Sequence, residues 1–174
     1  MHKVCAGDFD KMNLLFERHH RNLFGYFYRL TNDAEQSEDM VQIAFYRMLK
    51  YRHAYRGEGK FIYWMYSIAK NIWIDSGKKK SLIDYGRKSE DIMQFPSREK
   101  TGEDLLMATE RKQLLQKAMA QLSPLQKEAI ILSKFQGMKY QDIAEMLNCT
   151  ENTIKSRVHR GLIELKAIMQ KLEQ

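Results

Sequence analysis

The chain has 174 residues, which is enough for one domain or two small ones. Lys and Arg outnumber Asp and Glu by 29 to 22, and the net charge of +7 suits a polyanionic partner without proving one. Only Cys5 and Cys149 are present, which excludes a disulfide framework, and no Cys/His grouping has zinc spacing. No stretch reads as a signal peptide or a membrane-spanning helix, so we expect a reduced, cytoplasmic protein.

Apolar residues recur at helical spacing along most of the chain, and strand alternation is not found. A first helix is expected over about Asp8 to Leu30. Asp33, followed three residues later by Gln36, has the spacing of a capping box and should start a second helix. The loop "YRHAYRGEGK" separates it from a third helix that begins near Phe61. These patterns predict an all-α fold.

The helical pattern is lost from about Ser81 to Gly102, where charged residues alternate with Gly, Pro and Ser. We therefore predict two small helical domains, residues 1–82 and 105–174, that are joined by a flexible linker over residues 83–104.

The stretch "LSPLQ" is a helix start in the second domain. Ser123 should cap this helix, Pro124 should occupy its first position, and Gln126 should complete a capping box. The helix should run to about Gln136 and stop at Gly137.

A short helix, the turn "LNCT" and the stretch "TENTIKSRVHRG" have the lengths of a helix-turn-helix. Asn148 can take the left-handed conformation that the turn needs, and Thr150 can cap the second helix. A helical wheel places Ile154, Val158, Gly161, Leu162 and Leu165 on one side.

The opposite side carries Asn152, Thr153, Ser156, His159 and Arg160, with Lys155 and Arg157 on the flanks. An amide and hydroxyls can bond base edges while flanking cations hold phosphates, so this face suits duplex DNA. The alternative is the solvated face of an ordinary amphipathic helix, which would favour Glu and Lys near the helix start.

Residues 51–80 carry seven Lys and Arg against two carboxylates, with aromatic residues between them. Phe61 and Trp64 fall on the apolar face, whereas Tyr63, Tyr66 and Trp73 fall off it. Exposed rings beside cations suit single-stranded nucleic acid, because bases stack on rings while cations hold the backbone. A hydrophobic contact with another protein is the other interpretation.

Two blocks of the chain resemble conserved regions of bacterial sigma factors. "SEDMVQIAFYRML", with the loop and "FIYWMYSIAKNIWIDSGKKK" after it, resembles their second region. "LSPLQKEAIILSKFQGMKYQDIAEMLNCTENTIKSRVHRGLIELK" is similar to their fourth region. The order of these blocks, with nothing large between them, resembles the extracytoplasmic-function (ECF) subgroup of RNA polymerase sigma factors.

The resemblance implies three binding surfaces. The helix after Asp33 would dock on core RNA polymerase through Asp33, Glu35, Glu38, Asp39 and Gln42. Ile43 departs from the acidic residue that the family usually has there. The first domain would hold the melted minus-ten element through Arg56, Lys60, Tyr63, Trp64, Tyr66, Asn71, Lys78, Lys79 and Lys80. The second would bind the minus-thirty-five duplex through Thr150, Glu151, Asn152, Thr153, Lys155, Ser156, Arg157 and Arg160.

The sequence thus predicts an alternative sigma factor that binds core RNA polymerase and directs promoter recognition and DNA melting. The subgroup also implies an anti-sigma protein as a partner. No cofactor, metal or small-molecule substrate is expected, and no enzymatic activity, since no catalytic constellation is found. A free-standing helix-turn-helix regulator that acts without core polymerase is one alternative. The other is an enzyme or interaction protein with an incidental basic patch.

Overall fold

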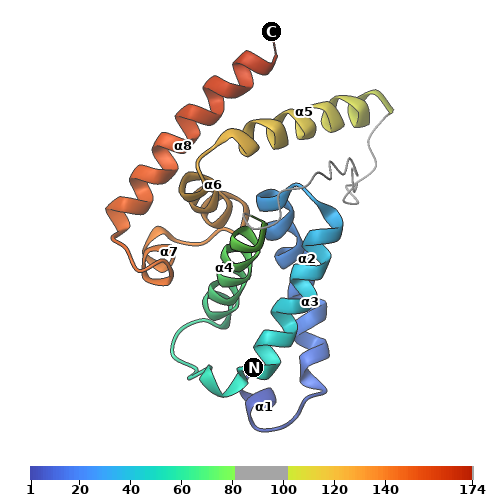
Figure 1. Ribbon diagram of the computed structural model, residues 1–174, viewed down its shortest axis with the longest axis vertical. Helices are drawn as coiled ribbons and strands as arrows, with labels where there is room; N and C mark the ends of the chain where they lie inside the picture. Colours follow the sequence, from blue (N-terminus) through green and yellow to red (C-terminus); the bar gives the residue numbers. More distant parts are fainter. Residues whose placement is uncertain (81–101, 174) are drawn as a thin grey trace.

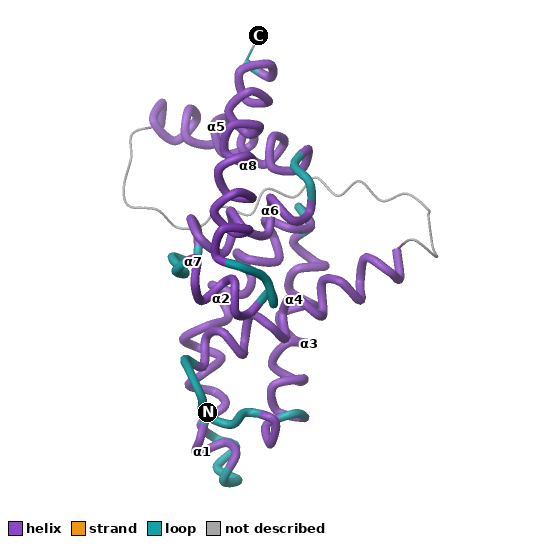
Figure 2. Tube along the Cα trace, turned by 90° about the vertical axis from the view of Figure 1, so that its left-hand side faces the viewer, coloured by secondary structure: helices purple, strands orange, loops and turns teal. Residues whose placement is uncertain are grey.

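The computed structural model describes residues 1–80 and 102–173, with side chains over residues 1–77 and 110–173. Every regular element in these ranges is a helix (Figure 2), which confirms the all-α prediction. Most of the linker expected at residues 83–104 lies outside the described residues. We refer to residues 1–80 as the first unit and residues 102–173 as the second unit.

The first unit is built from three long helices that pack side by side, with two short helical turns at one end (Figure 1). Its elements are α1 (His2–Cys5), α2 (Lys11–Thr31), α3 (Ala34–Lys50), the 3₁₀ helix η1 (Arg52–Ala54) and α4 (Phe61–Lys80). Phe27, Met48 and Met65 are fully buried in the core between the long helices. Burial of such large apolar side chains is the main force that holds this unit together.

The turn between α2 and α3 follows from local chemistry. Asn32 ends α2 in the left-handed conformation, with φ of 55°. The Asp33 Oδ1 then accepts a hydrogen bond of 2.9 Å from the backbone N–H of Gln36. This contact satisfies one of the unpaired donors at the start of α3, as the sequence predicts.

The second unit begins with a long helix and ends with the expected helix-turn-helix. Its elements are α5 (Gly102–Gln121), α6 (Pro124–Ile130), the π-helix η2 (Ile131–Phe135), α7 (Tyr140–Met146) and α8 (Glu151–Leu172). Ser123 and Gln126 form the predicted capping box at the start of α6, with Pro124 in the first turn. In the turn between α7 and α8, Asn148 is left-handed with φ of 50°, and Thr150 caps α8.

The helix that starts at Pro124 differs from the expectation in its second half. It was expected to be one continuous α-helix to about Gln136. Instead, a π turn follows Ile130, and the backbone N–H of Gln136 bonds the Ile131 carbonyl five residues back at 3.0 Å. Gly137, with φ of 66°, ends it in the left-handed conformation that glycine adopts without strain.

The inner face of α8 matches the helical wheel at Ile154, Val158 and Leu165, which are buried. Leu162 was expected there and is 39% exposed. Its position is roughly 80° around the helix from Ile154, at the border of the apolar stripe. Gly161 is the residue that lies against α6 instead.

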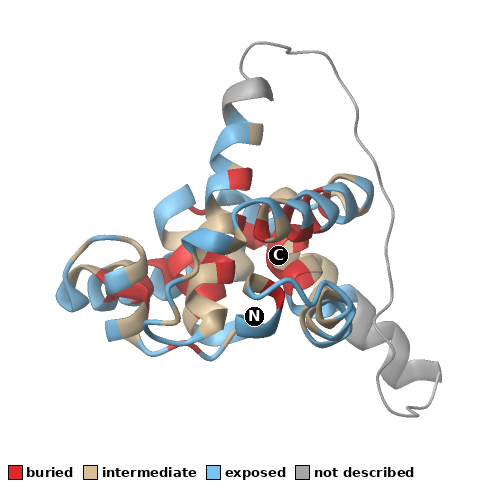
Figure 3. Cartoon of the chain, turned by 90° about the horizontal axis from the view of Figure 1, so that it is seen from below, coloured by how far each residue is buried: buried red, intermediate tan, exposed pale blue. Residues whose placement is uncertain are grey.

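The two units share one continuous apolar cluster. The segment from α6 to α7 lies against α2 and α4, whereas α5 and α8 extend beyond the first unit (Figure 1). Buried residues accordingly gather in the middle of the molecule, and the outward helical faces are exposed (Figure 3). The second unit therefore packs directly on the helix that carries the expected minus-ten residues.

Close packing at Gly161 gives a test of the contact between α6 and α8. A Cβ at this position would lie 2.8 Å from Ile130 Cδ1 and 3.1 Å from Gln126 Cβ. We expect Gly161→Leu to lower the free energy of unfolding by about 1–3 kcal/mol, because overpacking forces neighbours to move. This loss should occur although Leu favours a helix more than Gly.

Denaturant unfolding measures this change. The control is Ala167→Leu, which adds a large side chain at an exposed position of the same helix and should have an effect within about 0.5 kcal/mol. Equal stability of the two variants would contradict the tight α6–α8 contact.

Candidate nucleic-acid interface

The outward face of α8 presents most of the residues predicted to bind duplex DNA. Asn152, Ser156 and Arg160 are exposed together with Thr150, Glu151 and Lys155. Lys155 Nζ lies 2.8 Å from Glu151 Oε1, one turn earlier on the helix. Such an exposed pair contributes only about 0.3–0.5 kcal/mol, so Lys155 can exchange this carboxylate for a phosphate.

Two of the predicted duplex-binding residues are partly buried. The hydroxyls of Thr153 and Thr150 lie 2.8 Å apart, so Thr153 takes part in the cap of α8. Arg157 lines an open cleft with Lys70 and Trp73 of the first unit and with Glu128 of its own unit. The outward and unit-facing sides of α8 therefore meet at Arg157.

The loop before α4 and the start of that helix form an aromatic cluster. The ring of Tyr55 lies 5.9 Å from that of Phe61 and 5.3 Å from that of Trp64, between centroids. Tilted and edge-on pairs at this distance are attractive. Arg56 and Lys60 are exposed beside the cluster.

Tyr66 is placed differently from the expectation. It was expected to be an exposed ring, and it is fully buried. Its hydroxyl donates a 2.6 Å hydrogen bond to Oε1 of Gln136, from the second unit. Burial raises the pKa of Tyr66 above its ordinary value. The exposure prediction fails because periodicity within one helix cannot show that another unit covers its polar side.

The neighbouring predicted residues on α4 vary in exposure. Asn71 is exposed, and Trp64 and Trp73 are half-buried. Tyr63 is half-buried, and its hydroxyl donates a hydrogen bond to Asp142 Oδ2 of α7. This hydrogen bond, with some burial, raises the pKa of Tyr63 to about 12. The side chains of Lys78, Lys79 and Lys80, in the last turn of α4, lie outside the described residues.

The acidic face predicted to bind polymerase is open on α3. Glu35, Glu38, Asp39 and Gln42 are exposed, whereas Asp33 is engaged in the helix cap. Ile43 and Tyr46 are exposed as well, by 42% and 63%. Their spacing from Asp39 and Gln42 puts all four on one side of the helix. This combination of carboxylates and exposed apolar residues suits a protein contact, and Tyr46 was missed by sequence reasoning.

A buried carboxylate joins the two units and was also missed. Glu128 of α6 is 2% exposed, and its Oε1 accepts a 3.2 Å hydrogen bond from the Tyr26 hydroxyl of α2. Burial raises the pKa of Glu128, while Lys70, Tyr26 and Arg157 act in the opposite direction. The sequence does carry a signal for this burial, because Glu128 shares a helical stripe with Ile131 and Leu132, three and four positions later.

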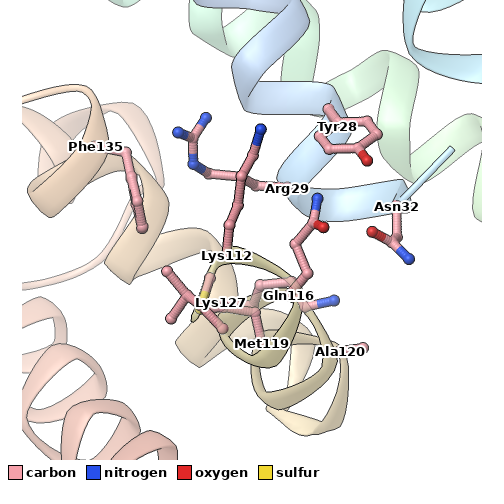
Figure 4. Close-up of a pocket in the computed structure, with 10 residues that line it drawn as sticks. Tyr28, Arg29, Asn32, Lys112, Gln116, Met119, Ala120, Lys127 and Phe135 are labelled. Atoms are coloured by element: carbon pink, nitrogen blue, oxygen red, sulfur yellow. The ribbon is translucent and has the colours of Figure 1, made fainter. Parts of the chain in front are cut away.

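Cations also line the contact between the two units on the side of α5 (Figure 4). The Arg29 guanidinium lies 4.2 Å from the centroid of the Phe135 ring and donates 2.7 Å to the Gly25 carbonyl. Lys127 Nζ donates to the Leu30 carbonyl at 3.5 Å, near the negative end of α2. Arg29, Lys112, Lys127 and Phe135 line a cavity of about 70 Å³. Burial lowers the pKa of Arg29, Lys112 and Lys127.

Within the described part of the chain, no helix is both long enough and apolar enough to cross a bilayer. In the same residues, His, Cys, Asp and Glu form no group of three that could hold a metal ion.

The fold and its surfaces define a two-part DNA-binding protein, with a helix-turn-helix on one unit and a cationic, aromatic face on the other. Residues 15–83 match the Sigma-70 region 2 family, and residues 112–165 match the family described as Sigma-70, region 4. The two matches together span most of the chain.

Named relatives agree with this assignment. The chain is 27% identical to the ECF RNA polymerase sigma factor SigX of Bacillus subtilis, over 95% of this chain and 87% of that protein. It is 28% identical to the RNA polymerase sigma factor CarQ of Myxococcus xanthus, over 99% of this chain and 97% of that protein.

A solved structure is also similar. The sigma factor RpoE of Bartonella quintana, crystallised with the anti-sigma factor NepR, has a TM-score of 0.71 and 25% identity, covering 94% of this chain and 97% of RpoE. The chain belongs to the ECF subgroup of RNA polymerase sigma factors. It is an alternative sigma factor that binds core RNA polymerase and directs promoter recognition at transcription initiation.

The raised pKa of Glu128 predicts a pH dependence of stability. The folded chain binds a proton at this carboxylate more tightly than the unfolded chain, whose pKa is near 4.5. The Glu128 contribution is therefore most favourable below that pKa and declines as pH rises toward the folded pKa. Glu128→Gln cannot titrate, so its stability relative to wild type should increase over this pH range.

Thermal unfolding of both proteins between pH 4 and 8 measures this difference. Glu110→Gln, at an exposed carboxylate of α5, is the control and should show a flat difference. A flat difference for Glu128→Gln as well would mean that Glu128 is ionised equally in both states.

Proposed function

We propose that the three surfaces divide the work of promoter recognition. The outward face of α8 binds the minus-thirty-five duplex, and the loop before α4 with the start of α4 holds the melted minus-ten strand. The acidic face of α3 docks on core RNA polymerase. The observation that carries this proposal is the separation of the α8 face from the α3 face, each with chemistry suited to its partner.

The proposal extends to the boundaries and the setting. Residues 1–82 act as the polymerase and minus-ten domain, residues 105–174 act as the minus-thirty-five domain, and residues 83–104 link them. The chain itself catalyses no reaction, because RNA synthesis belongs to the polymerase that it binds. It acts in the cytoplasm, where the polymerase meets the promoter. An anti-sigma protein, the class of partner found with RpoE of Bartonella quintana, holds it inactive.

Paired variants test the division of roles. Arg160→Ala should weaken holoenzyme binding to a promoter fragment by roughly 5- to 150-fold, the loss expected for one base contact of about 1–3 kcal/mol, and leave core affinity unchanged. Asp39→Ala should weaken core binding and leave the promoter contact of the assembled holoenzyme intact. The promoter fragment is chosen by mapping transcript start sites after overexpression.

Fluorescence anisotropy with labelled promoter and with labelled core measures both affinities. Failure of the wild-type chain to bind core polymerase would favour a free-standing helix-turn-helix regulator. Affinity for DNA that is flat with salt would contradict a phosphate-driven contact, which should weaken steeply as salt rises.

The burial of Tyr66 adds a conformational step. In this arrangement the Tyr66 hydroxyl donates a hydrogen bond to Gln136, and the Tyr63 hydroxyl donates one to Asp142. Both hydroxyls are therefore bonded to residues of the second unit. We infer that the two units separate when the minus-ten strand binds. The energy of their contact then opposes binding, because only the open population is competent.

Loosening the contact should therefore strengthen minus-ten binding. Gln136→Ala removes the acceptor of Tyr66, and a lost hydrogen bond of about 1 kcal/mol should raise the affinity for a single-stranded minus-ten oligonucleotide up to about fivefold. Gln141→Ala, an exposed neutral position on α7, is the matched control and should leave affinity unchanged. Lower affinity in Gln136→Ala would mean that the closed arrangement itself binds the strand.

A further inference from the structure

The segment before α2 packs on the loop assigned to the minus-ten strand. Residues 2–10, which we call the strap, contain α1 and a short turn. Val4 of the strap is fully buried, and α1 lies against both α2 and η1 (Figure 1). The region 2 match begins at residue 15, so the strap lies before the matched residues.

Two strap residues hold the start of the loop. The Cys5 thiol donates a hydrogen bond to the Arg52 carbonyl, with Sγ 3.0 Å from the oxygen. The Arg52 guanidinium lies 5.1 Å from the centroid of the Phe9 ring and also donates to the Leu49 carbonyl at 3.2 Å. These contacts fix both the backbone and the side chain of Arg52.

A third strap residue holds the middle of the loop. The His2 ring lies 5.3 Å from the ring of Tyr55, between centroids. It also fills the space above Gly57, where a Cβ would come within 2.3 Å of His2 Cε1. The strap thus contacts the loop at positions 52, 55 and 57.

The loop needs such outside support. After η1 it has no regular structure until α4 begins, and both Gly57 and Gly59 have positive φ, of 77° and 79°. A segment with two glycines in this conformation has a large conformational freedom to lose when it is ordered. A binding loop performs best when neighbouring contacts have already fixed its shape.

Tyr55 connects the strap to the residues that would face DNA. Its ring contacts His2 on one side and Phe61 and Trp64 on the other. Arg56, Lys60 and Asn71 are left exposed, so the strap supports the loop without covering its polar groups.

We propose that the strap is a positioning element that sets the base preference at the minus-ten element, acting through His2 on Tyr55 and Gly57. The proposal rests on the assignment of this loop to the minus-ten strand. Loss of the strap should leave the loop chemically intact and change only how sharply it distinguishes one base from another.

The first test replaces His2 and measures promoter selectivity in the assembled holoenzyme. Transcription from a library with randomised minus-ten and minus-thirty-five positions gives the base preference at each position. His2→Ala should lower selectivity in the minus-ten element by about two- to tenfold, the range expected for one lost aromatic contact. Selectivity in the minus-thirty-five element and core affinity should stay unchanged. Val4→Asp, which places a charge in the buried site and undocks the strap, should produce at least the same loss.

The second test uses the two loop glycines as a matched pair. Gly57→Ala and Gly59→Ala both place a side chain at a positive φ, but a Cβ meets His2 at position 57 and open space at position 59. In double-mutant cycles with His2→Ala, Gly57→Ala should couple to His2 and Gly59→Ala should not. Equal coupling at both positions would overturn the direct contact of His2 with the loop.

Arg56→Ala separates this proposal from the assignment on which it rests. If Arg56→Ala changes the minus-ten preference while His2→Ala and Val4→Asp leave it unchanged, the loop reads the strand and the strap has no part in it. If Arg56→Ala has no effect either, the loop assignment itself fails. A gain in minus-ten affinity when the strap is undocked would show that the strap covers the loop, which also overturns the proposal.

Discussion

The buried hydrogen bond between Glu128 and Tyr26 is the contact on which the arrangement of the two units depends. A carboxylate loses its hydration when it is buried, and this cost is tolerable only when partners surround it. Here the partners come from α2, α4 and α8, in the form of Tyr26, Lys70 and Arg157. The hydrogen bond comes from the first unit, so the second unit alone would leave Glu128 without it. The acid therefore favours one particular docking of the units over many similar apolar contacts.

The same docking engages groups on the two faces that we propose bind nucleic acid. Lys70 and Arg157 face a carboxylate of the chain itself, and Tyr66 bonds an amide from the other unit. In the proposed function, Glu128 competes with a phosphate for these two cations, and the Gln136 amide competes with a base edge for Tyr66. If the units separate when the promoter binds, as we propose, DNA must displace these intramolecular partners first.

Sequence reasoning succeeded where the determinants are local. Asp33, Ser123 and Thr150 cap helices because each side chain reaches a backbone N–H within its own turn, and Asn148 adopts the left-handed turn for a similar reason. It failed at Tyr66 and Glu128, because helical periodicity shows which side of a helix is polar but not what covers it. The strap lacked a pattern altogether, since its contacts with the loop are about fifty residues distant in sequence.

The π turn at Ile131–Phe135 changes which side of the helix faces the interior of the second unit and which side faces the first unit. A single inserted residue rotates everything after it by about 100° relative to an uninterrupted α-helix. Ile130 and Ile131 therefore remain inside the second unit, while Phe135 and Gln136 turn toward Arg29 and Tyr66 of the first. One additional residue thus lets a single short segment serve as the interior of its own unit and as the docking surface for the other.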